Sequence, residues 1–182
     1  MLEQAVEGGD SAVVSALLRA GAQPAAVVAG GQSALHTAAA AVRRDGEALL
    51  LRLLLRALAA AGGGGGGGGV DARVVSSGAT ALMVAARAGH AAGVRLLLEA
   101  GADPNARAGV SLHGATALYL ACEHGRLEAA QQLVRGAGAA LRLQPQLVAH
   151  RTTPLIAAVR ALTAAAASIM HACCAGNGPC AR

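Results

Sequence analysis

The chain of 182 residues is 54% hydrophobic but only 1% aromatic, so a folded core must be packed from Ala, Leu and Val side chains. Its net charge of +5 lies in residues 126–182, which hold six Arg against one Glu, whereas the charges of residues 1–125 cancel. This excess favours a partner with an acidic surface, and the scarcity of aromatic side chains for base stacking argues against nucleic acid.

Residues 1–32 form the first of several related units. Apolar residues spaced three and four positions apart predict two short helices, each ending near a Gly. The chain begins just before the first helix, without a capping residue, so it is expected to start within a repeat. A shift of 80 residues places nine residues of this unit on identical residues farther along: Leu2, Ala5, Gly9, Val14, Leu17, Leu18, Gly21, Ala22 and Pro24.

Residues 33–79 form the second unit, which opens with "SALHTAA" and carries two insertions. Ser33 is its predicted helix cap. One insertion lies near "AVRRDG", between the two helices, and the other precedes Asp71 and includes Gly62–Gly69. Consecutive glycines hold no fixed structure, and these lack the Lys-Ser/Thr of a phosphate-binding loop. Residues 62–69 are therefore predicted to be a disordered surface loop.

The third and fourth units, residues 80–115 and 116–152, share the clearest pattern. "GATALMVAARAGH" begins at Gly78 and "GATALYLACEHGR" at Gly114. Thr80 and Thr116 are predicted N-caps, and Gly89 suits the left-handed conformation that ends a helix. Two apolar stripes are expected to be buried in the third unit, one on each helix: Leu82, Ala85 and Ala86, then Val94, Leu97 and Leu98.

The last unit, from residue 153 to 162 and onward, keeps only "TPLIAAV" of the pattern, and residues 163–182 are expected to form an Ala-rich helix and a frayed tail. The tail contains metal-ligand residue types, but their spacing matches no zinc motif, so no metal site is predicted there. These residues are His171, Cys173, Cys174 and Cys180.

A unit of this kind cannot bury its apolar face alone, so its neighbours must stack on it in an all-α solenoid. The pattern resembles the ankyrin repeat, most closely in residues 78–105, "GATALMVAARAGHAAGVRLLLEAGADPN". The resemblance covers residues 1–162, with Ala in place of the family's Pro at positions 34, 81 and 117. It implies an ankyrin-type stack in which one repeat carries the Gly-rich insertion.

The resemblance also implies a non-catalytic module that binds a protein partner in a concave groove lined by loop tips and first helices. Tyr119, the single aromatic residue, is expected either to anchor the partner or to pack against its neighbouring loop. Transferred onto this chain, the groove positions are Ser76, Ser77, Met83, Arg87, Leu112, His113, Tyr119, Glu123, His124, His150, Ile156 and Arg160.

No catalytic motif, cofactor or small-molecule substrate is predicted. Cys122 occupies a small core position, and His90 is expected to bond loop backbone. Two alternatives stay open: a regulatory or substrate-recruiting fragment of a larger enzyme or ubiquitin-ligase adaptor, and nucleic-acid binding by the basic C-terminal third. Apolar stretches too short to span a bilayer, and four Cys without framework spacing, favour an intracellular protein, cytoplasmic or nuclear.

Overall fold

A computed structural model describes residues 2–23, 31–41, 45–60 and 69–138 of the chain. Within these ranges the regular elements are helical, and an isolated bridge pairs Arg73 with Thr80. The all-α prediction is therefore confirmed. The helices are α1 (Leu2–Glu7), α2 (Ser11–Arg19), α3 (Ala34–Ala41), α4 (Asp45–Ala60), α5 (Ala81–Ala88), α6 (Ala91–Glu99), α7 (Ala117–Glu123) and α8 (Leu127–Ala137), with a 3₁₀ turn η1 (Val110–Leu112).

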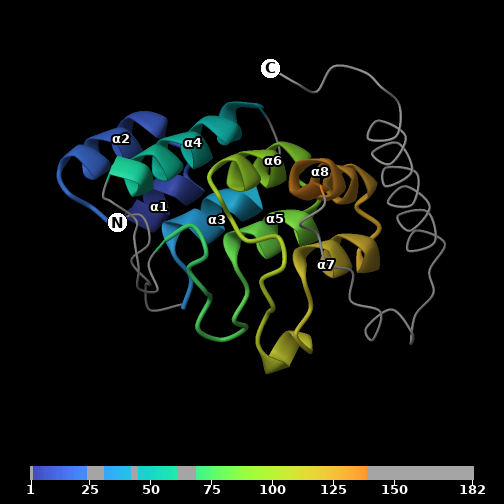
Figure 1. The fold of residues 1–182 in the computed structure, drawn as a ribbon. Coiled ribbons are helices and arrows are strands. Elements are labelled where there is room, and N and C mark those ends of the chain that lie inside the picture. The colour runs from blue at the N-terminus through green and yellow to red at the C-terminus, as the bar shows by residue number, and fades with distance from the viewer. Residues whose placement is uncertain (1, 24–30, 42–44, 61–68, 139–182) are drawn as a thin grey trace, which may run out of the picture.

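The helices form two layers (Figure 1). The first helix of each pair, α1, α3, α5 and α7, packs on the next to make an inner layer, and α2, α4, α6 and α8 make an outer layer above it. Long loops before α5 and before α7 project away from both layers on the same side (Figure 1). Each pair of one inner and one outer helix is thus one repeat of a linear stack, as the repeated sequence predicts.

Helix ends follow the capping chemistry expected from the sequence. The hydroxyl oxygens of Thr80 and Thr116 accept from the backbone N–H of Met83 and Tyr119, each at 3.4 Å. Gly89 ends α5 with φ at 90°, a left-handed conformation that a side chain would disfavour. These caps keep the inner helices short. The chain therefore passes directly from each inner helix into the outer helix that follows it.

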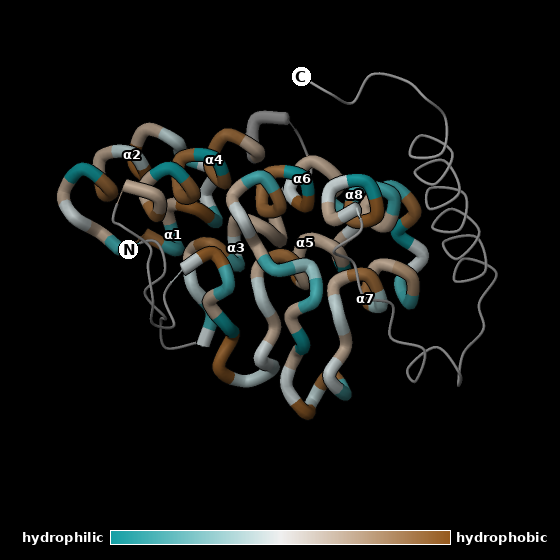
Figure 2. Tube along the Cα trace, viewed as in Figure 1, coloured by the Kyte–Doolittle hydropathy of each residue, from teal (hydrophilic) through white to brown (hydrophobic). Residues whose placement is uncertain are grey.

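The core lies between the two layers and between successive pairs. Leu82 and Leu97 are fully buried, and so are the small residues Ala85 and Ala121, which let neighbouring inner helices approach closely. Figure 2 shows brown hydrophobic stretches along the helices and again at the tips of the projecting loops. The Ala- and Leu-rich composition is therefore used in packing between repeats.

The first pair is less well covered than the others. Leu2, Ala5 and Leu17 are only half-buried, although they correspond to Leu82, Ala85 and Leu97, which are fully buried. The inner helix α1 has an inner neighbour, α3, on one side, whereas α5 has α3 and α7 on its two sides. Among the described helices, one flank of the first repeat is therefore an incompletely covered stacking face.

Several predicted segments lie outside the described residues: the glycine run as far as residue 68, the fifth unit, the Ala-rich tail and the cluster of His171, Cys173, Cys174 and Cys180. In the part of the chain that is described, no helix combines the length and the apolar character that a membrane crossing requires.

Candidate partner-binding surface

The candidate surface comprises the inner helices and the two long loops that project from them. The first loop turns back on itself at residues 74–79, where the Val74 N–H donates to the Ala79 carbonyl at 2.9 Å. The second loop closes in the same way, with the Ala108 N–H donating to the Ala115 carbonyl at 3.0 Å. Each loop is therefore a compact turn held by its own backbone.

The bases of the two loops are also tied to each other. The Asp71 carboxylate accepts from the Asp103 backbone N–H, at 3.1 Å to Oδ1 and 3.3 Å to Oδ2. The Arg73 guanidinium donates to the carbonyl oxygens of Gly78 and Arg107. These charged side chains, all in exposed residues, are used to fix backbone positions rather than to present free charge at the loop tips.

The tips of the loops touch directly. The Gly109 N–H donates to the Ser77 carbonyl at 2.9 Å, and the Ser111 hydroxyl donates to the Ser76 carbonyl at 3.4 Å. A Cβ on Gly78 would lie 2.6 Å from the Gly109 nitrogen, so the two backbones meet at a distance that no side chain permits. The predicted site residues Ser76 and Ser77 thereby contact the loop that carries Leu112 and His113.

His36 links the second repeat to the base of the first long loop. Its Nε2 lies 3.0 Å from the Ala72 carbonyl, and its Nδ1 lies 2.8 Å from the Ser33 hydroxyl. Because the ring is buried, its pKa lies below the ordinary value of 6.5. A neutral imidazole satisfies both contacts, with Nε2–H donating to the carbonyl and Nδ1 accepting from the hydroxyl.

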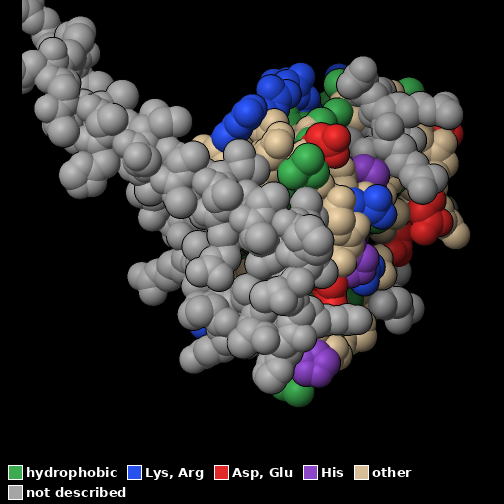
Figure 3. All heavy atoms as spheres, turned by 90° about the vertical axis from the view of Figure 1, so that its right-hand side faces the viewer, with side chains coloured by type: hydrophobic (Ala, Val, Ile, Leu, Met, Phe, Trp, Pro, Cys, Tyr) green, Lys and Arg blue, Asp and Glu red, His purple; other side chains and the backbone are tan. Residues whose placement is uncertain are grey.

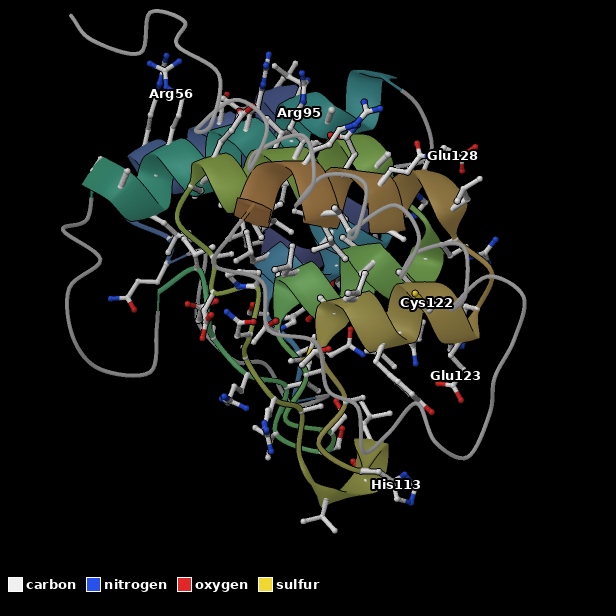
Figure 4. The ribbon with its side chains drawn as sticks, turned by 45° about the vertical axis from the view of Figure 1, so that its right-hand side comes forward. Arg56, Arg95, His113, Cys122, Glu123 and Glu128 are labelled. Atoms are coloured by element: carbon white, nitrogen blue, oxygen red, sulfur yellow. The ribbon has the colours of Figure 1, made fainter. Side chains whose placement is uncertain are left out.

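The inner helices contribute a second group of predicted site residues. Arg87, Glu123 and His124 are exposed at the C-terminal ends of α5 and α7, whereas Tyr119 is half-buried and packs against the core. Arg126 donates from Nε to the Arg87 carbonyl at 3.2 Å, which joins successive repeats at this end. Figure 4 shows His113 at the loop tip and Glu123 at the far end of α7, so the structure separates the predicted residues into two groups.

Met83 is a correction to the predicted site. Its side chain is only 1% exposed, so it cannot contact a partner as the repeat pattern suggested. The helix that carries it, α5, has inner helices on both sides, and Met83 belongs to the hydrophobic core. The predicted positions His150, Ile156 and Arg160 lie outside the described residues.

His90 also differs from the expectation. Its Nε2 lies 2.9 Å from the carbonyl oxygen of Ala40, within helix α3, and not from loop backbone. That carbonyl belongs to the last turn of α3, and the carbonyls at the end of a helix are commonly satisfied by groups from outside it. His90 therefore joins the second and third repeats in addition to beginning α6.

Two exposed residues were missed by the sequence analysis. Val75 is 76% exposed and Val110 is 94% exposed, each in one of the two long loops. Apolar residues were predicted to be buried where they recur three and four positions apart on a helix. Val75 and Val110 lie in loops and are not part of such a pattern. Their position between small and polar loop residues was the only sequence signal that could have marked them.

Charges of both signs occur elsewhere on the described surface. In Figure 3, blue side chains gather along the upper edge, over the outer helices, while red and purple side chains are interspersed below them.

Among the described residues no group of three or more His, Cys, Asp or Glu could hold a metal ion. Burial raises the pKa of the Cys122 thiol to about 11, so this core residue is protonated at neutral pH.

Comparison with known protein families gives two matches. Residues 2–108 match the model described as ankyrin repeats in three copies, and residues 113–143 match the model of a single ankyrin repeat. The boundary between the two matches falls in the second long loop, next to η1. The matches together include all eight α-helices of the described structure.

Proposed function

Because the chain belongs to the ankyrin-repeat family, whose repeats are generally protein–protein interaction modules, we propose that it binds a protein partner in a concave groove. The groove would be lined by the inner helices on one side and by the two long loops on the other. Its role is recognition without chemistry, and its protein partner can carry an acidic surface toward the six Arg of residues 126–182.

The observation that carries this proposal is the interlocking of the loops. Hydrogen bonds from Gly109 to Ser77 and from Asp103 to Asp71 hold two successive loops in one arrangement before any partner arrives. A surface that is already ordered loses little conformational entropy on binding, so more of the contact free energy appears as affinity. Ordered loops beside exposed helix ends are the features that a rigid recognition surface needs.

Tyr119 is the residue of the groove most suited to anchor a partner. It is half-buried on α7, so its ring is held in place by the core while part of it stays accessible. Tyr combines a large apolar ring with a hydroxyl and is enriched among residues that dominate binding free energy. If Tyr119 instead serves only to pack against its neighbouring loop, its removal will change stability and leave affinity unaltered.

The test compares Tyr119→Ala with Arg95→Ala. Proximity labelling in cells identifies the partner, and calorimetry with the purified pair then measures affinity for each variant. Tyr119→Ala should weaken binding by about 2 kcal/mol or more, which is roughly thirtyfold. Arg95 is the control, because it lies on the outer helix α6 with its side chain 58% exposed and a single pairing to Glu99 at 3.9 Å.

The two variants must also be compared in stability. We expect Arg95→Ala to leave both affinity and melting temperature unchanged, since exposed ion pairs contribute little. An equal loss of affinity in the two variants, or a loss confined to Arg95→Ala, would place the binding surface on the outer layer and refute the proposal.

A further inference from the structure

The tips of the two long loops form a continuous surface, here named the loop ridge and defined as residues 74–79 and 108–115. The Ser111 hydroxyl donates to the Ser76 carbonyl across the ridge at 3.4 Å. Val75 and Val110 are the chain neighbours of these two serines, and they are 76% and 94% exposed. Both are apolar side chains that the fold leaves in water, although the described residues have an extensive apolar core.

The ridge is fixed by its backbone, so the two valines are presented in a set arrangement. The Val75 N–H donates to the Gly31 carbonyl at 3.0 Å, and the Gly109 N–H donates to the Ser77 carbonyl at 2.9 Å. His113 ends the η1 turn with φ at 53°, and it is the one described residue other than Gly with a positive φ. A backbone conformation of this kind persists only where the surroundings enforce it.

The ridge carries no Asp, Glu, Lys or Arg. Its two segments read "VVSSGA" and "AGVSLHGA", and His113 is the only titratable side chain among them. The nearest charged residues along the chain, Arg73 and Arg107, lie at the loop bases, where the Arg73 side chain donates to the Arg107 carbonyl. A charged segment would lose hydration on contact with this surface, and an uncharged surface offers no charge–charge attraction to offset that loss.

From these observations we propose that the loop ridge docks an uncharged aliphatic segment of the protein partner, which Val75 and Val110 contact directly. This inference rests on the proposed function and adds the chemistry of the partner at this site. Contact would remove both valines from water, and the fixed ridge would lose little entropy in doing so. Nucleic acid is a poor occupant, because the ridge offers no cation to a phosphate.

The experiment uses a displayed library of random 12-residue peptides selected on the full chain. Enriched peptides are synthesised and titrated against the wild type, the double variant Val75→Ser/Val110→Ser and the control Val13→Ser. Val13 is a matched control, because it is also an exposed valine, at 47%, but lies on the outer helix α2. We expect enriched peptides to share neighbouring aliphatic residues and to lose at least tenfold in affinity for the double variant only.

Three results would overturn the inference. The first is enrichment of charged or aromatic sequences without an aliphatic pair, and the second is equal affinity for the double variant and the wild type. The third is self-association of the chain that the double variant abolishes in light scattering, which would make a second copy the occupant.

A Tyr119→Ala titration separates this inference from the function it rests on. Peptides that depend on Tyr119 and not on the valines would leave the groove proposal standing while refuting the ridge. Peptides that depend on the valines alone would support the ridge and remove Tyr119 from the binding surface. Circular dichroism of each variant should give the wild-type spectrum, since both valines are exposed and their replacement removes no core contact.

Discussion

Leu97→Ala tests whether stability resides in packing between repeats. Leu97 is fully buried on α6, which packs against α4 and α8 on its two sides. The substitution removes three carbon atoms, worth about 2.4 kcal/mol of transfer free energy at ~0.8 kcal/mol each. Helices fixed on both sides cannot collapse into the space, so a cavity term adds to this, and the total should fall at about 2.5–5 kcal/mol.

Leu17→Ala is the matched control, because Leu17 holds the same register position in the first repeat but is only half-buried. Its replacement should cost about half as much, since part of its side chain is already in water. Urea denaturation followed by circular dichroism measures both changes in the free energy of unfolding. A cost under about 0.5 kcal/mol at Leu97, the range of surface residues, or equal costs at the two positions, would refute this account of packing.

Three further predictions concern the loops and the buried histidine. Shortening Gly62–Gly69 to two or three residues should leave the melting temperature unchanged or slightly higher, because loop-closure entropy varies slowly with length; a large decrease would show that the run is packed. Gly78→Ala should destabilise the protein by more than the ~1–2 kcal/mol that a left-handed backbone costs a residue with a side chain, because the new Cβ would also meet Gly109. Gly101→Ala is the control: its surroundings are open, so it should cost only the backbone strain. Burial lowers the pKa of His36 in the folded state, so the unfolded chain takes up the proton first as pH falls. The free energy of unfolding should therefore be at its full value above about pH 6.5 and decline below it. His36→Gln should flatten this part of a profile of melting temperature against pH.

Local chemistry explains what the sequence could predict. Thr80 and Thr116 cap their helices and Gly89 ends α5, because these roles depend on residues only a few positions away. Burial of Leu82 and Leu97 also follows from helical spacing. The repeated phrase made the stack predictable, since each repeat must present the same apolar faces to its neighbours.

Features that depend on neighbouring repeats could not be predicted in the same way. Met83 occupies the position that Tyr119 holds in the next repeat, yet it is buried because helices flank α5 on both sides. The contact between Gly78 and Gly109 joins loops that are distant in sequence, and no local pattern encodes the distance between their backbones. The predicted groove positions remain predictions, apart from Met83, which the structure removes from the set.

The lower burial of the first repeat predicts an order in which the described repeats open. In a linear stack each repeat is stabilised by its neighbours, and among the described helices α1 and α2 pack on one neighbouring pair, whereas α5 and α6 pack on two. Their amide hydrogens should therefore exchange with solvent through a low-energy local opening, ahead of those of α5 and α6. Such fraying spares the interlocked loops before α5 and α7, so the chain can lose its first repeat transiently and still present an intact loop ridge.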